Sequence, residues 1–597
     1  MNSPEDILQG IFGFDEFRPG QKEIIDFLMT GQNTLAVMPT GAGKSMCFQV
    51  PAMLSEHLSI VVSPLVALMD DQVAGLRANG VPAECIHSGL SRDDQVAAWL
   101  RVKDGACRLL YLSPERLMTA RMLAALAKIR IFMFVIDEAH CISKWGVSFR
   151  PEYDQLSRLG ALFPETTFAA FTATADRATR EDIAAKLFRK NGRIIVHGFD
   201  RPNLRFGVAA KSDWKAQVMA FLEDKADQSG IVYCLSRRYT EEVTTFLRDN
   251  GFNAMPYHAG LDAGVRKENQ NRFMSEDGAI MVATIAFGMG IDKPDIRYVC
   301  HLNLPGSLEA YYQEIGRAGR DGEAAETLML FGLDDIRMRR MFIDQDGEDD
   351  DHKIREHKRL DSLMAYSDAT GCRRASLLSY FDEVIEPCGN CDNCLNPPVL
   401  IDGTEQARLL MAAIIQTGQF FGTNHINDVL RGADNQKIRD KGHNTLEAYA
   451  SGKEYSKKYW QTFMRQAVAG GYLKINVQRY GCLEITAKGE SVLEQGAPFL
   501  FKEINDAPST KSKPPRSKAV QALGQQDAGV FSELKALRLR LAKELDVPAY
   551  VVFSDATLLD MVAKRPTSLD EMLSVNGIGP SKLEKYGDDF LGVLSAP

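Results

Sequence analysis

The sequence predicts an α/β protein built from two tandem lobes, each a parallel β-sheet wrapped by helices, with smaller domains after them. Three observations predict this fold class. Residues 1–205 alternate short apolar runs with helical segments, residues 206–340 repeat that alternation, and the text beyond residue 340 is mostly helical. At 597 residues the chain can hold roughly four average domains, each with its own core.

Each lobe is predicted from short apolar runs, each as long as a β-strand, which are separated by segments with a helical pattern. The first lobe contains TLAVM, SIVVS, RLLYLS, FMFVID and TFAAFTA. The second contains GIVYC, NAMPYH, AIMVAT, YVCHLN and TLMLF. Short apolar strands that alternate with helices are typical of parallel sheets with helical crossovers.

The remaining chain divides into four segments. Residues 341–400 are charged and helical, and they end in a cysteine cluster. Residues 401–505 read as helices followed by YLKINVQRYGCLEIT, whose alternation around a glycine predicts the β-hairpin of a winged helix. Residues 506–527, rich in Pro, Ser and Lys, are predicted to be a linker, and residues 528–597 a small all-α module that contains the amphipathic stretch LKALRLRLAKEL.

Composition is that of an ordinary globular protein, with 45% hydrophobic and 25% charged residues. No apolar run is long enough to span a bilayer, and MNSPEDILQG lacks the features of a signal peptide, so we expect a cytoplasmic protein with no membrane partner. The net charge of −9 argues against nucleic acid, but phosphate binding needs only a local basic surface. Residues 431–480 hold ten Lys or Arg against four Asp or Glu, so this segment is the predicted basic surface.

A phosphate-binding loop is predicted directly after the strand TLAVM. The text PTGAGKSM places Gly41, Gly43, Lys44 and Ser45 between that strand and a helix, after Thr40. The backbone amides of such a loop cradle phosphates, the lysine reaches the β and γ oxygens, and the hydroxyl binds Mg²⁺.

An acidic pair and an arginine-rich turn complete the predicted hydrolysis site. Asp137 ends the strand FMFVI and would hold Mg²⁺, while Glu138 would orient and deprotonate the attacking water. Read alone, this pair is a solvated acidic turn.

The second lobe ends in YYQEIGRAGRDG, which would bring positive charge to the γ-phosphate from across a cleft. Read alone, this segment would be a basic surface turn. Its candidate catalytic residues are Gln313, Arg317 and Arg320.

Four of the eleven cysteines form the pattern C-x15-C-x2-C-x2-C. They are Cys372, Cys388, Cys391 and Cys394. Four thiolates suit a tetrahedral, structural Zn²⁺ site. The alternative is a redox dithiol at Cys391 and Cys394, since C-x2-C pairs also occur in redox sites.

The sequence resembles superfamily 2 helicases, and within them the RecQ family of DNA helicases, in its bacterial form. The resemblance covers nearly the whole chain, follows the family's order, and identifies the lobes as RecA-like, residues 401–505 as the RQC winged helix and residues 528–597 as an HRDC-like module. Its signatures are FGFDEFRPGQ, TGAGKS, SPLVALMDDQV, YLSPERL, DEAHCISKWGVSFRPEY, FTATA, YHAGL, VATIAFGMGIDKP and YYQEIGRAGRDG.

The resemblance assigns further residues to the nucleotide site. It implies that Phe14 and Arg18 sandwich adenine and that Gln21 reads its edge, which makes ATP the nucleotide. Without the resemblance, the F-x-x-F-R run from Phe14 to Arg18 would be interpreted as an element that packs against a helix. His140 would line the cleft with Gln313, Arg320 would be the arginine finger with Arg317 nearby, and FTATA would couple hydrolysis to strand separation through Thr172 and Thr174.

The segment after the acidic pair is, in this family, an aromatic-rich loop that senses single-stranded DNA. Trp145, Phe149 and Arg150 are the implied DNA contacts, because aromatic faces stack on any base for roughly 1 to 3 kcal/mol each. Without the resemblance, these aromatics would read as packing in the core or between the lobes.

The loop departs from the family text at one informative position. The chain reads K-W-G-V-S-F-R from Lys144 to Arg150, where the family usually reads Q-W-G-H-D-F-R. Val147 can neither donate nor accept a hydrogen bond, so a polar relay through this position is missing. We expect hydrolysis to be stimulated by single-stranded DNA but loosely coupled to it. ATPase rates with and without DNA test this, and unchanged stimulation in a Val147→His variant contradicts it.

Two C-terminal features carry open alternatives. The hairpin around Tyr480 and Gly481 would act at the strand junction, or would serve as a packing or dimerisation wing. The HRDC-like module would bind DNA weakly or contact protein. Its VNGIGPSK turn would cradle a phosphate with its amides, or would be an ordinary glycine-permitted turn between helices.

The resemblance implies an ATP-dependent, Mg²⁺-dependent 3′ to 5′ DNA helicase. Its DNA partners would be single-stranded and branched DNA, in repair, recombination and the SOS response to damage. It also implies a single-stranded DNA-binding protein and a topoisomerase as protein partners, and we expect a monomer. The alternatives are a nucleic-acid-stimulated ATPase or RNA remodeller, and a non-catalytic DNA-binding scaffold, which the complete set of catalytic residues disfavours.

Overall fold

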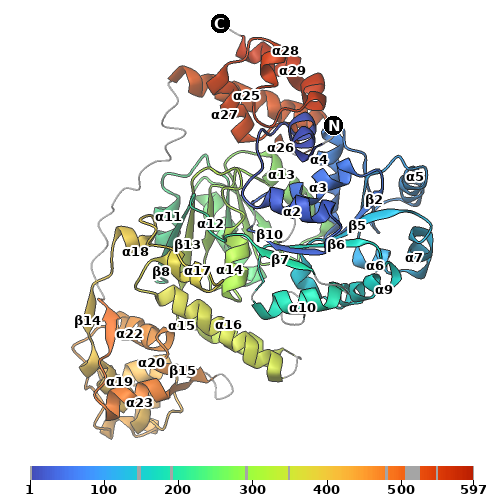
Figure 1. The fold of residues 1–597 in the computed structure, drawn as a ribbon. Helices are drawn as coiled ribbons and strands as arrows, with labels where there is room; N and C mark the ends of the chain where they lie inside the picture. Colours follow the sequence, from blue (N-terminus) through green and yellow to red (C-terminus); the bar gives the residue numbers. More distant parts are fainter. Residues whose placement is uncertain are drawn as a thin grey trace.

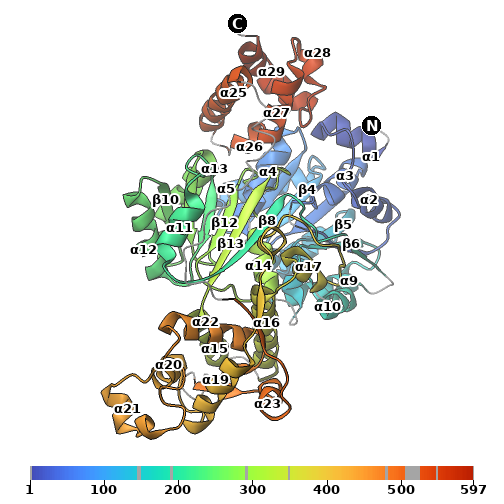
Figure 2. The ribbon, with the colours of Figure 1, turned by 90° about the vertical axis from the view of Figure 1, so that its left-hand side faces the viewer.

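The computed structural model describes residues 3–39, 41–143, 150–175, 177–188, 192–288, 293–346, 350–476, 482–503, 525–545, 547 and 549–595. Within these ranges the chain forms two α/β lobes, a cysteine-bearing helical subdomain, a winged helix and a C-terminal helical module. Figures 1 and 2 place the module and the winged helix at opposite ends of the molecule, with the lobes between them. The predicted fold class is confirmed.

Lobe 1 is built on a sheet with strand order β3-β4-β2-β5-β6-β1-β7, in which every described pair is parallel. β1, β2 and β4 have no exposed residue, as expected for parallel strands that helices cover on both faces. The strands are β1 Thr34–Val37, β2 Leu58–Val62, β3 Ala83–Ile86, β4 Leu109–Leu112, β5 Ile131–Ile136, β6 Thr167–Thr172 and β7 Arg193–Val196.

The lobe 1 helices connect these strands and cover the sheet (Figure 1). Several of them begin at a side chain that accepts a hydrogen bond from the first turn, as Ser91 and Ser113 do. The helical elements are α1 Pro4–Ile7, η1 Leu8–Phe12, α2 Gln21–Met29, α3 Met46–Leu54, α4 Val66–Ala78, α5 Arg92–Lys103, α6 Pro114–Leu117, α7 Ala120–Leu126, η2 Ala139–Ile142, α8 Pro151–Asp154, η3 Gln155–Arg158, α9 Leu159–Leu162 and α10 Arg177–Leu187.

Lobe 2 repeats the design with strand order β10-β11-β9-β12-β13-β8, again parallel throughout. Its strands are β8 Leu204–Ala210, β9 Gly230–Tyr233, β10 Asn253–Tyr257, β11 Ala279–Ala283, β12 Tyr298–His301 and β13 Ala325–Phe331. Its helices are α11 Trp214–Leu222, α12 Arg237–Asp249, α13 Ala263–Ser275, α14 Leu308–Ile315 and α15 Leu333–Gln345.

The cysteine-bearing subdomain and the winged helix follow lobe 2. The subdomain contains α16 Asp350–Asp368, α17 Arg373–Ser379 and α18 Asp392–Leu395. The predicted hairpin is present as an antiparallel pair of strands, and its tip, with Tyr480 and Gly481, lies outside the described residues. The winged-helix elements are β14 Leu400–Asp402, α19 Thr404–Gln416, α20 Thr423–Arg431, α21 Gln436–Asp440, η4 His443–Thr445, α22 Lys457–Ala469, β15 Leu473–Asn476, β16 Cys482–Ile485, α23 Ala487–Glu494 and β17 Leu500–Lys502.

The C-terminal module is entirely helical within its described residues and has its own core. Its helices are α25 Gln525–Glu544, α26 Ala549–Val552, α27 Asp555–Lys564, α28 Leu569–Met572 and α29 Pro580–Leu594. Leu534, Leu558, Met561 and Phe590 are fully buried in that core. The module is therefore a separate folding unit that rests on the lobes.

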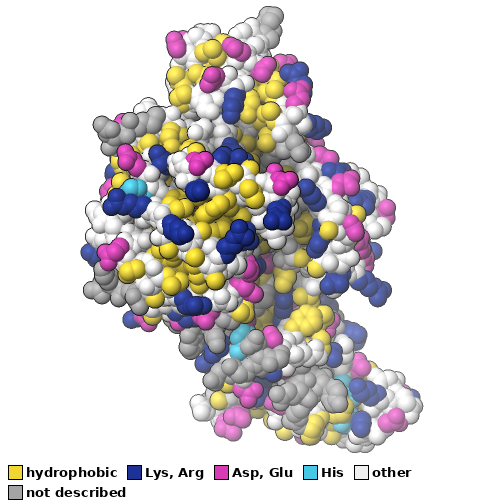
Figure 3. Space-filling view, turned by 90° about the vertical axis from the view of Figure 1, so that its right-hand side faces the viewer, with side chains coloured by type: hydrophobic (Ala, Val, Ile, Leu, Met, Phe, Trp, Pro, Cys, Tyr) yellow, Lys and Arg dark blue, Asp and Glu magenta, His cyan; other side chains and the backbone are white. Residues whose placement is uncertain are grey.

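One outer face of lobe 1 is unusually apolar. Val96 and Leu100 of α5 and Leu162 of α9 are each about half exposed. Figure 3 shows hydrophobic side chains gathered in the middle of this face, with Lys and Arg side chains around them. Side chains of both charges surround the apolar centre of this face (Figure 3).

Candidate nucleotide-hydrolysis site and zinc centre

The loop between β1 and α3 has the backbone of a phosphate cradle. Gly41 and Gly43 have φ values of +85° and +79°, which side-chain-bearing residues rarely adopt. A β-carbon at Gly43 would also lie 2.5 Å from the Nε2 atom of Gln21. Glycine is therefore required here by the backbone conformation, while Thr40 lies outside the described residues.

Lys44 is folded back over this loop. Its ammonium donates to the carbonyl oxygens of Met38, at 3.2 Å, and Pro39, at 3.5 Å. Burial lowers the pKa of Lys44, and the carboxylates of Glu138 and Asp137 oppose that shift. A cation held in this way is poised to neutralise phosphate oxygens.

The acidic pair stands at the end of β5. Burial, reinforced by the neighbouring charge of Glu138, raises the pKa of Asp137 to about 7, whereas Lys44 acts in the opposite direction. Glu138 has a φ of 48°, a left-handed conformation that is uncommon for a residue other than glycine. Two carboxylates that repel each other in a buried site form a strong site for a divalent cation.

A chain of polar contacts runs from the acidic pair into lobe 2. His140 Nδ1 lies 3.3 Å from Glu138 Oε2 and 2.9 Å from the hydroxyl oxygen of Thr172. The Thr172 hydroxyl donates to the carbonyl oxygen of Thr174 at 3.1 Å. Gln313 of α14 then donates from Nε2 to the Thr174 hydroxyl at 2.5 Å. Glu138 and the second lobe are thereby connected through side chains of β6 and the residues after it.

Replacing Gln313 with alanine should uncouple the lobes without emptying the nucleotide site. The Gln313→Ala variant loses the bond to Thr174, so we expect stimulation of ATP hydrolysis by single-stranded DNA to fall about tenfold or more while nucleotide affinity changes little. ATPase rates and equilibrium nucleotide binding measure the two effects. A Gln345→Ala variant, at the exposed end of α15, is the control. Equal loss of binding and stimulation would contradict this connecting role.

The segment between the lobes, which contains Arg201 and Asn203, stabilises the arginine-rich turn through hydrogen bonds. Arg201 donates to the carbonyl oxygens of Ala318 and Gly319, at 2.8 Å each, and Asn203 donates to Gly319 at 2.9 Å. Arg317 in this turn is 6% exposed. Sequence reasoning missed Arg201 and Asn203, although the run DRPN just before lobe 2 could have pointed to them. Their bonds fix where the turn faces lobe 1.

Lys44, the acidic pair and the arginine-rich turn line one cavity of about 790 Å³. Gln21 and His140 are not on its wall: the Gln21 amide donates to the carbonyl oxygens of Ala42 and Gly43 behind the loop. The predicted site residues that do line the cavity are Phe14, Arg18, Gly41, Gly43, Lys44, Ser45, Asp137, Glu138, Gln313, Arg317 and Arg320.

The predicted DNA-sensing loop is only partly described. Trp145 and Phe149 lie outside the described residues. Arg150 donates from Nη1 to the carbonyl oxygen of Pro64 at 3.1 Å, and its backbone N–H donates to Cys141 at 2.9 Å. The structure therefore places the end of this loop against the residues that follow β2.

The two lobes carry a matching histidine turn that sequence reasoning did not connect. His87 Nδ1 accepts from the N–H of Gly89 while Nε2 bonds to Asp70, at 3.1 and 2.9 Å. His258 repeats this with Gly260 and Glu241, at 3.2 and 2.8 Å. The sequence H-x-G-L, which both lobes contain in IHSGL and YHAGL, could have pointed to this match.

Beside the second turn lies a cavity of about 680 Å³. It is lined by Leu235, Ser236, Arg237, Arg238, Ala259, Thr284, Ile285 and Ala286.

The first histidine turn also resembles a metal site, because ligand atoms of Asp70, Cys85 and His87 lie within 4.8 Å of one another. A metal-bound histidine normally donates its other ring N–H to a neighbour. His87 instead accepts a backbone N–H at Nδ1, so its proton sits on Nε2 and faces Asp70. This cluster is a hydrogen-bonded turn rather than a metal site.

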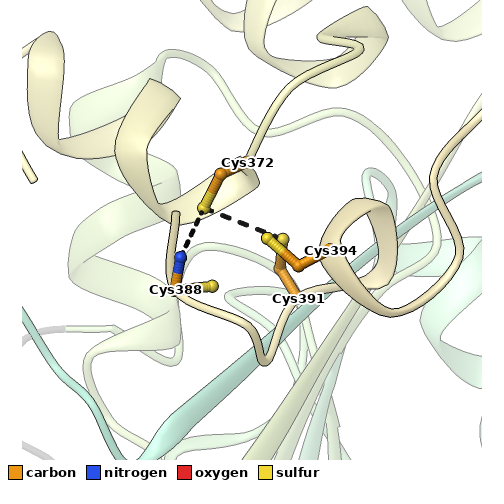
Figure 4. Close-up of side chains that lie close together, drawn as sticks. All are labelled: Cys372, Cys388, Cys391 and Cys394. Carbon is orange, nitrogen blue, oxygen red and sulfur yellow. Dashed lines mark hydrogen bonds between the residues drawn. The ribbon is translucent and has the colours of Figure 1, made fainter. Parts of the chain in front are cut away.

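The four clustered cysteines converge on one point (Figure 4). Their sulfur atoms all lie within 4.8 Å of one another, and the Sγ atoms of Cys391 and Cys372 are 3.9 Å apart. Sulfurs held tetrahedrally at about 2.3 Å from Zn²⁺ lie about 3.8 Å apart, so the geometry fits this ion.

Backbone donors around the sulfurs support thiolates. The N–H groups of Ala375 and Cys388 donate to Cys372 Sγ at 3.4 and 3.3 Å, and the N–H of Arg373 donates to Cys391 Sγ at 3.3 Å. Burial raises the pKa of Cys372, but the backbone donors and the thiols of Cys388 and Cys394 outweigh it and lower the pKa to about 7. All four sulfur atoms are within reach of one ion, which favours a metal site over a redox dithiol at Cys391 and Cys394 alone.

Comparison with known proteins covers the chain from end to end. Its segments match the DEAD/DEAH box helicase family at 18–183, the helicase conserved C-terminal domain at 214–322, the RecQ zinc-binding domain at 333–395, the RQC domain at 397–510 and the HRDC domain at 527–594. The chain is 39% identical to ATP-dependent DNA helicase RecQ of Pasteurella multocida, over 99% of this chain and 93% of that protein. For the Bacillus subtilis protein of the same name the identity is 36%, over 100% and 99%. With every domain in order and a third of the residues shared along the full length, this chain belongs to the RecQ family of helicases.

Proposed function

We propose that this chain is an ATP-dependent DNA helicase that translocates along single-stranded DNA in the 3′ to 5′ direction. It unwinds duplex and junction DNA in repair, recombination and the response to DNA damage. The observation that carries the proposal is the single cavity in which Lys44 and Glu138 of one lobe face Arg317 and Arg320 of the other. A hydrolysis site shared by two lobes ties each ATP to a movement of one lobe against the other.

The residues of the cavity divide the chemistry between them. Lys44 neutralises the β- and γ-phosphates, while the Ser45 hydroxyl and the Asp137 carboxylate would hold Mg²⁺. Glu138 orients the attacking water and takes its proton. Arg317 and Arg320 stabilise the charge that develops on the γ-phosphate, and Mg²⁺ supplies further neutralisation when bound.

Phe14 and Arg18 form the nucleoside end of the cavity, where adenine stacks between a ring and a guanidinium. Arg18 also donates to the carbonyl oxygen of Gly41, which ties this end to the phosphate loop. Gln21 supports the loop from behind, through its bonds to Ala42 and Gly43. Stacking accepts any base, so the choice of ATP rests on the match to the DEAD/DEAH box helicase family and on the relatives named ATP-dependent helicases.

DNA is proposed to run across both lobes, past the histidine turn of each. In lobe 2 the cavity beside His258 presents Arg237, Arg238 and the Ser236 hydroxyl, which suit a phosphodiester backbone. Trp145 and Phe149 would stack on bases near Glu138. The basic winged helix would hold the duplex ahead of the motor.

Strand separation with tailed duplexes tests the proposal. In the presence of ATP and Mg²⁺, we expect unwinding of a duplex with a 3′ single-stranded tail and little unwinding of one with a 5′ tail. Unwinding of the 5′-tailed substrate alone would reverse the direction, and unwinding of neither would leave only a nucleotide hydrolase or DNA-binding scaffold. ATPase stimulation by single-stranded RNA equal to that by DNA would favour an RNA remodeller instead.

Zinc, location and partners complete the proposal. Cys372, Cys388, Cys391 and Cys394 hold one structural Zn²⁺, as predicted from their spacing. Within the described residues, no helix is long and apolar enough to cross a bilayer. We propose that the protein acts as a cytoplasmic monomer, with a single-stranded DNA-binding protein and a topoisomerase as its protein partners.

A further inference from the structure

The C-terminal module forms one wall of the nucleotide cavity. Besides residues of the two lobes, the cavity is lined by side chains from α26, α27 and the residues between α28 and α29. Figure 1 shows the module above the lobes, beside the N-terminal segment of the chain. The polar side chains on this wall are Tyr550, Ser554, Thr557, Asp560 and Asn576.

The module meets lobe 1 through direct contact between two backbones. The N–H of Gly577 donates to the carbonyl oxygen of Gly13 at 2.7 Å. A β-carbon on Gly13 would lie 2.5 Å from the carbonyl carbon of Ile578, and one on Gly579 would lie 2.4 Å from the carbonyl oxygen of Ile11. Only glycine permits so close an approach. The VNGIGPSK turn was predicted to bind a phosphate through its amides as one alternative. Its Gly577 amide instead donates to the backbone of lobe 1.

This contact lies at the nucleoside end of the cavity. Gly13 immediately precedes Phe14, and Gly577 immediately follows Asn576, so the hydrogen-bonded glycines bring Phe14 and Asn576 to the same region of the wall. The backbone N–H of Asn576 donates to Asp560 Oδ2 at 2.8 Å, which fixes this turn onto α27. The part of the wall beside Phe14 is therefore fixed to α27 of the module.

The module also touches lobe 2. Lys535 of α25 pairs with Asp277 of lobe 2 at 3.6 Å, and Ser581 of α29 donates to the carbonyl oxygen of Ala78 in lobe 1 at 3.2 Å. The docked module thus spans the cleft between the lobes. Movement of one lobe against the other changes at least one of these contacts.

We infer that the docked module retains the nucleoside end of the bound nucleotide, so that release of the nucleotide requires the module to undock. The inference rests on the proposed ATP site. The Thr557 hydroxyl and the Asn576 amide offer donors and acceptors to a ribose and a purine base. Because coupling between two binding events is reciprocal, a nucleotide in the cavity also stabilises the docked module.

A Gly579→Ala variant tests the inference. Gly579 is the N-cap of α29 with a φ of −92°, which alanine adopts without strain, so the added methyl group opposes docking and leaves the module's own fold intact. Gly592→Ala is the matched control, because a β-carbon there meets nothing within 4 Å. Both substitutions are made in the full chain with zinc bound.

Two measurements are taken on each variant. Hydrogen exchange of a peptide covering residues 575–580 reports docking, since the Gly577 amide is bonded to Gly13. Stopped-flow detection of free ADP reports release. In Gly579→Ala we expect faster exchange together with release faster by about tenfold, within the usual range for coupled sites. The control should match the wild-type protein.

Each other outcome overturns the inference. Faster exchange with unchanged ADP release would show that the module docks without retaining nucleotide. Unchanged exchange would show that the glycine contact is not what docks it. Failure of the wild-type protein to bind ADP would instead refute the proposed ATP site, so the two failures are distinguishable.

Discussion

A Glu138→Gln variant will bind ATP and hydrolyse it about 100 to 10,000 times more slowly than the wild-type protein, the range that loss of a general base produces. Glutamine keeps the size of the side chain and its contact distance to His140, but it cannot take a proton from water. Removing one of two adjacent carboxylates also lowers the negative charge that a triphosphate meets beside Asp137, so nucleotide binding should be kept or strengthened. Steady-state ATPase rates and equilibrium nucleotide binding measure both effects.

Glu115→Gln is the control for this variant, because Glu115 is an exposed glutamate of α6 in the same lobe. It should hydrolyse ATP at the wild-type rate. Near-normal hydrolysis by Glu138→Gln would mean that another group activates the water. Loss of nucleotide binding in that variant would instead assign Glu138 to the support of the site.

Cys391→Ser will lose the bound zinc and loosen the subdomain from lobe 2. Cys391 is fully buried, and a serine hydroxyl is a poor substitute for a thiolate ligand. Mutating only the hydrogen-bond partner of a ligand lowers metal affinity by up to about a hundredfold. Loss of the ligand itself should therefore lower zinc affinity by at least about a hundredfold. The neighbouring Asp392 accepts a hydrogen bond from the backbone N–H of Val208 in β8. Zinc content by mass spectrometry and limited proteolysis of α16 to α18 report the two effects.

Cys300→Ser provides the comparison, since Cys300 is a buried thiol of β12 and is not one of the four clustered cysteines. It should retain one zinc per chain. Zinc retention by Cys391→Ser, together with an unchanged proteolysis pattern, would contradict the four-cysteine site.

The lobes were predictable because their central strands are buried on both faces and read as apolar runs. Each quoted run contains a strand, but β3, β7 and β8 were not predicted. β3 carries Glu84, whose charge is satisfied by Arg77 and Arg101 from neighbouring helices. β7 lies at the sheet edge with three of its four residues exposed. Such strands form because they pair with neighbouring strands in the folded sheet, and the local pattern of apolar residues does not reveal that pairing.

The candidate site was predictable to the extent that short motifs carry its chemistry. Lys44 and Glu138 stand in the strand-loop settings that their sequence context indicated. The position of Gln21 behind the loop and the contact of Gly577 with Gly13 could not be predicted. Both depend on segments that only the folded chain brings together, and Gly13 lies more than five hundred residues before Gly577 in the chain.

We expect the charges gathered around the phosphate loop to make the folded chain sensitive to heat when no nucleotide is bound. Burial pushes both Lys44 and Asp137 toward their uncharged forms, and the Nε atom of the buried Arg317 has no hydrogen-bond partner among the described residues. We therefore expect the empty protein to melt at a lower temperature than the loaded protein, because a triphosphate with Mg²⁺ supplies partners for these groups together. Ligand at a hundred times its Kd adds about 2.7 kcal/mol to the free energy of unfolding. The protein is therefore most resistant to heat and proteolysis while it is loaded with nucleotide.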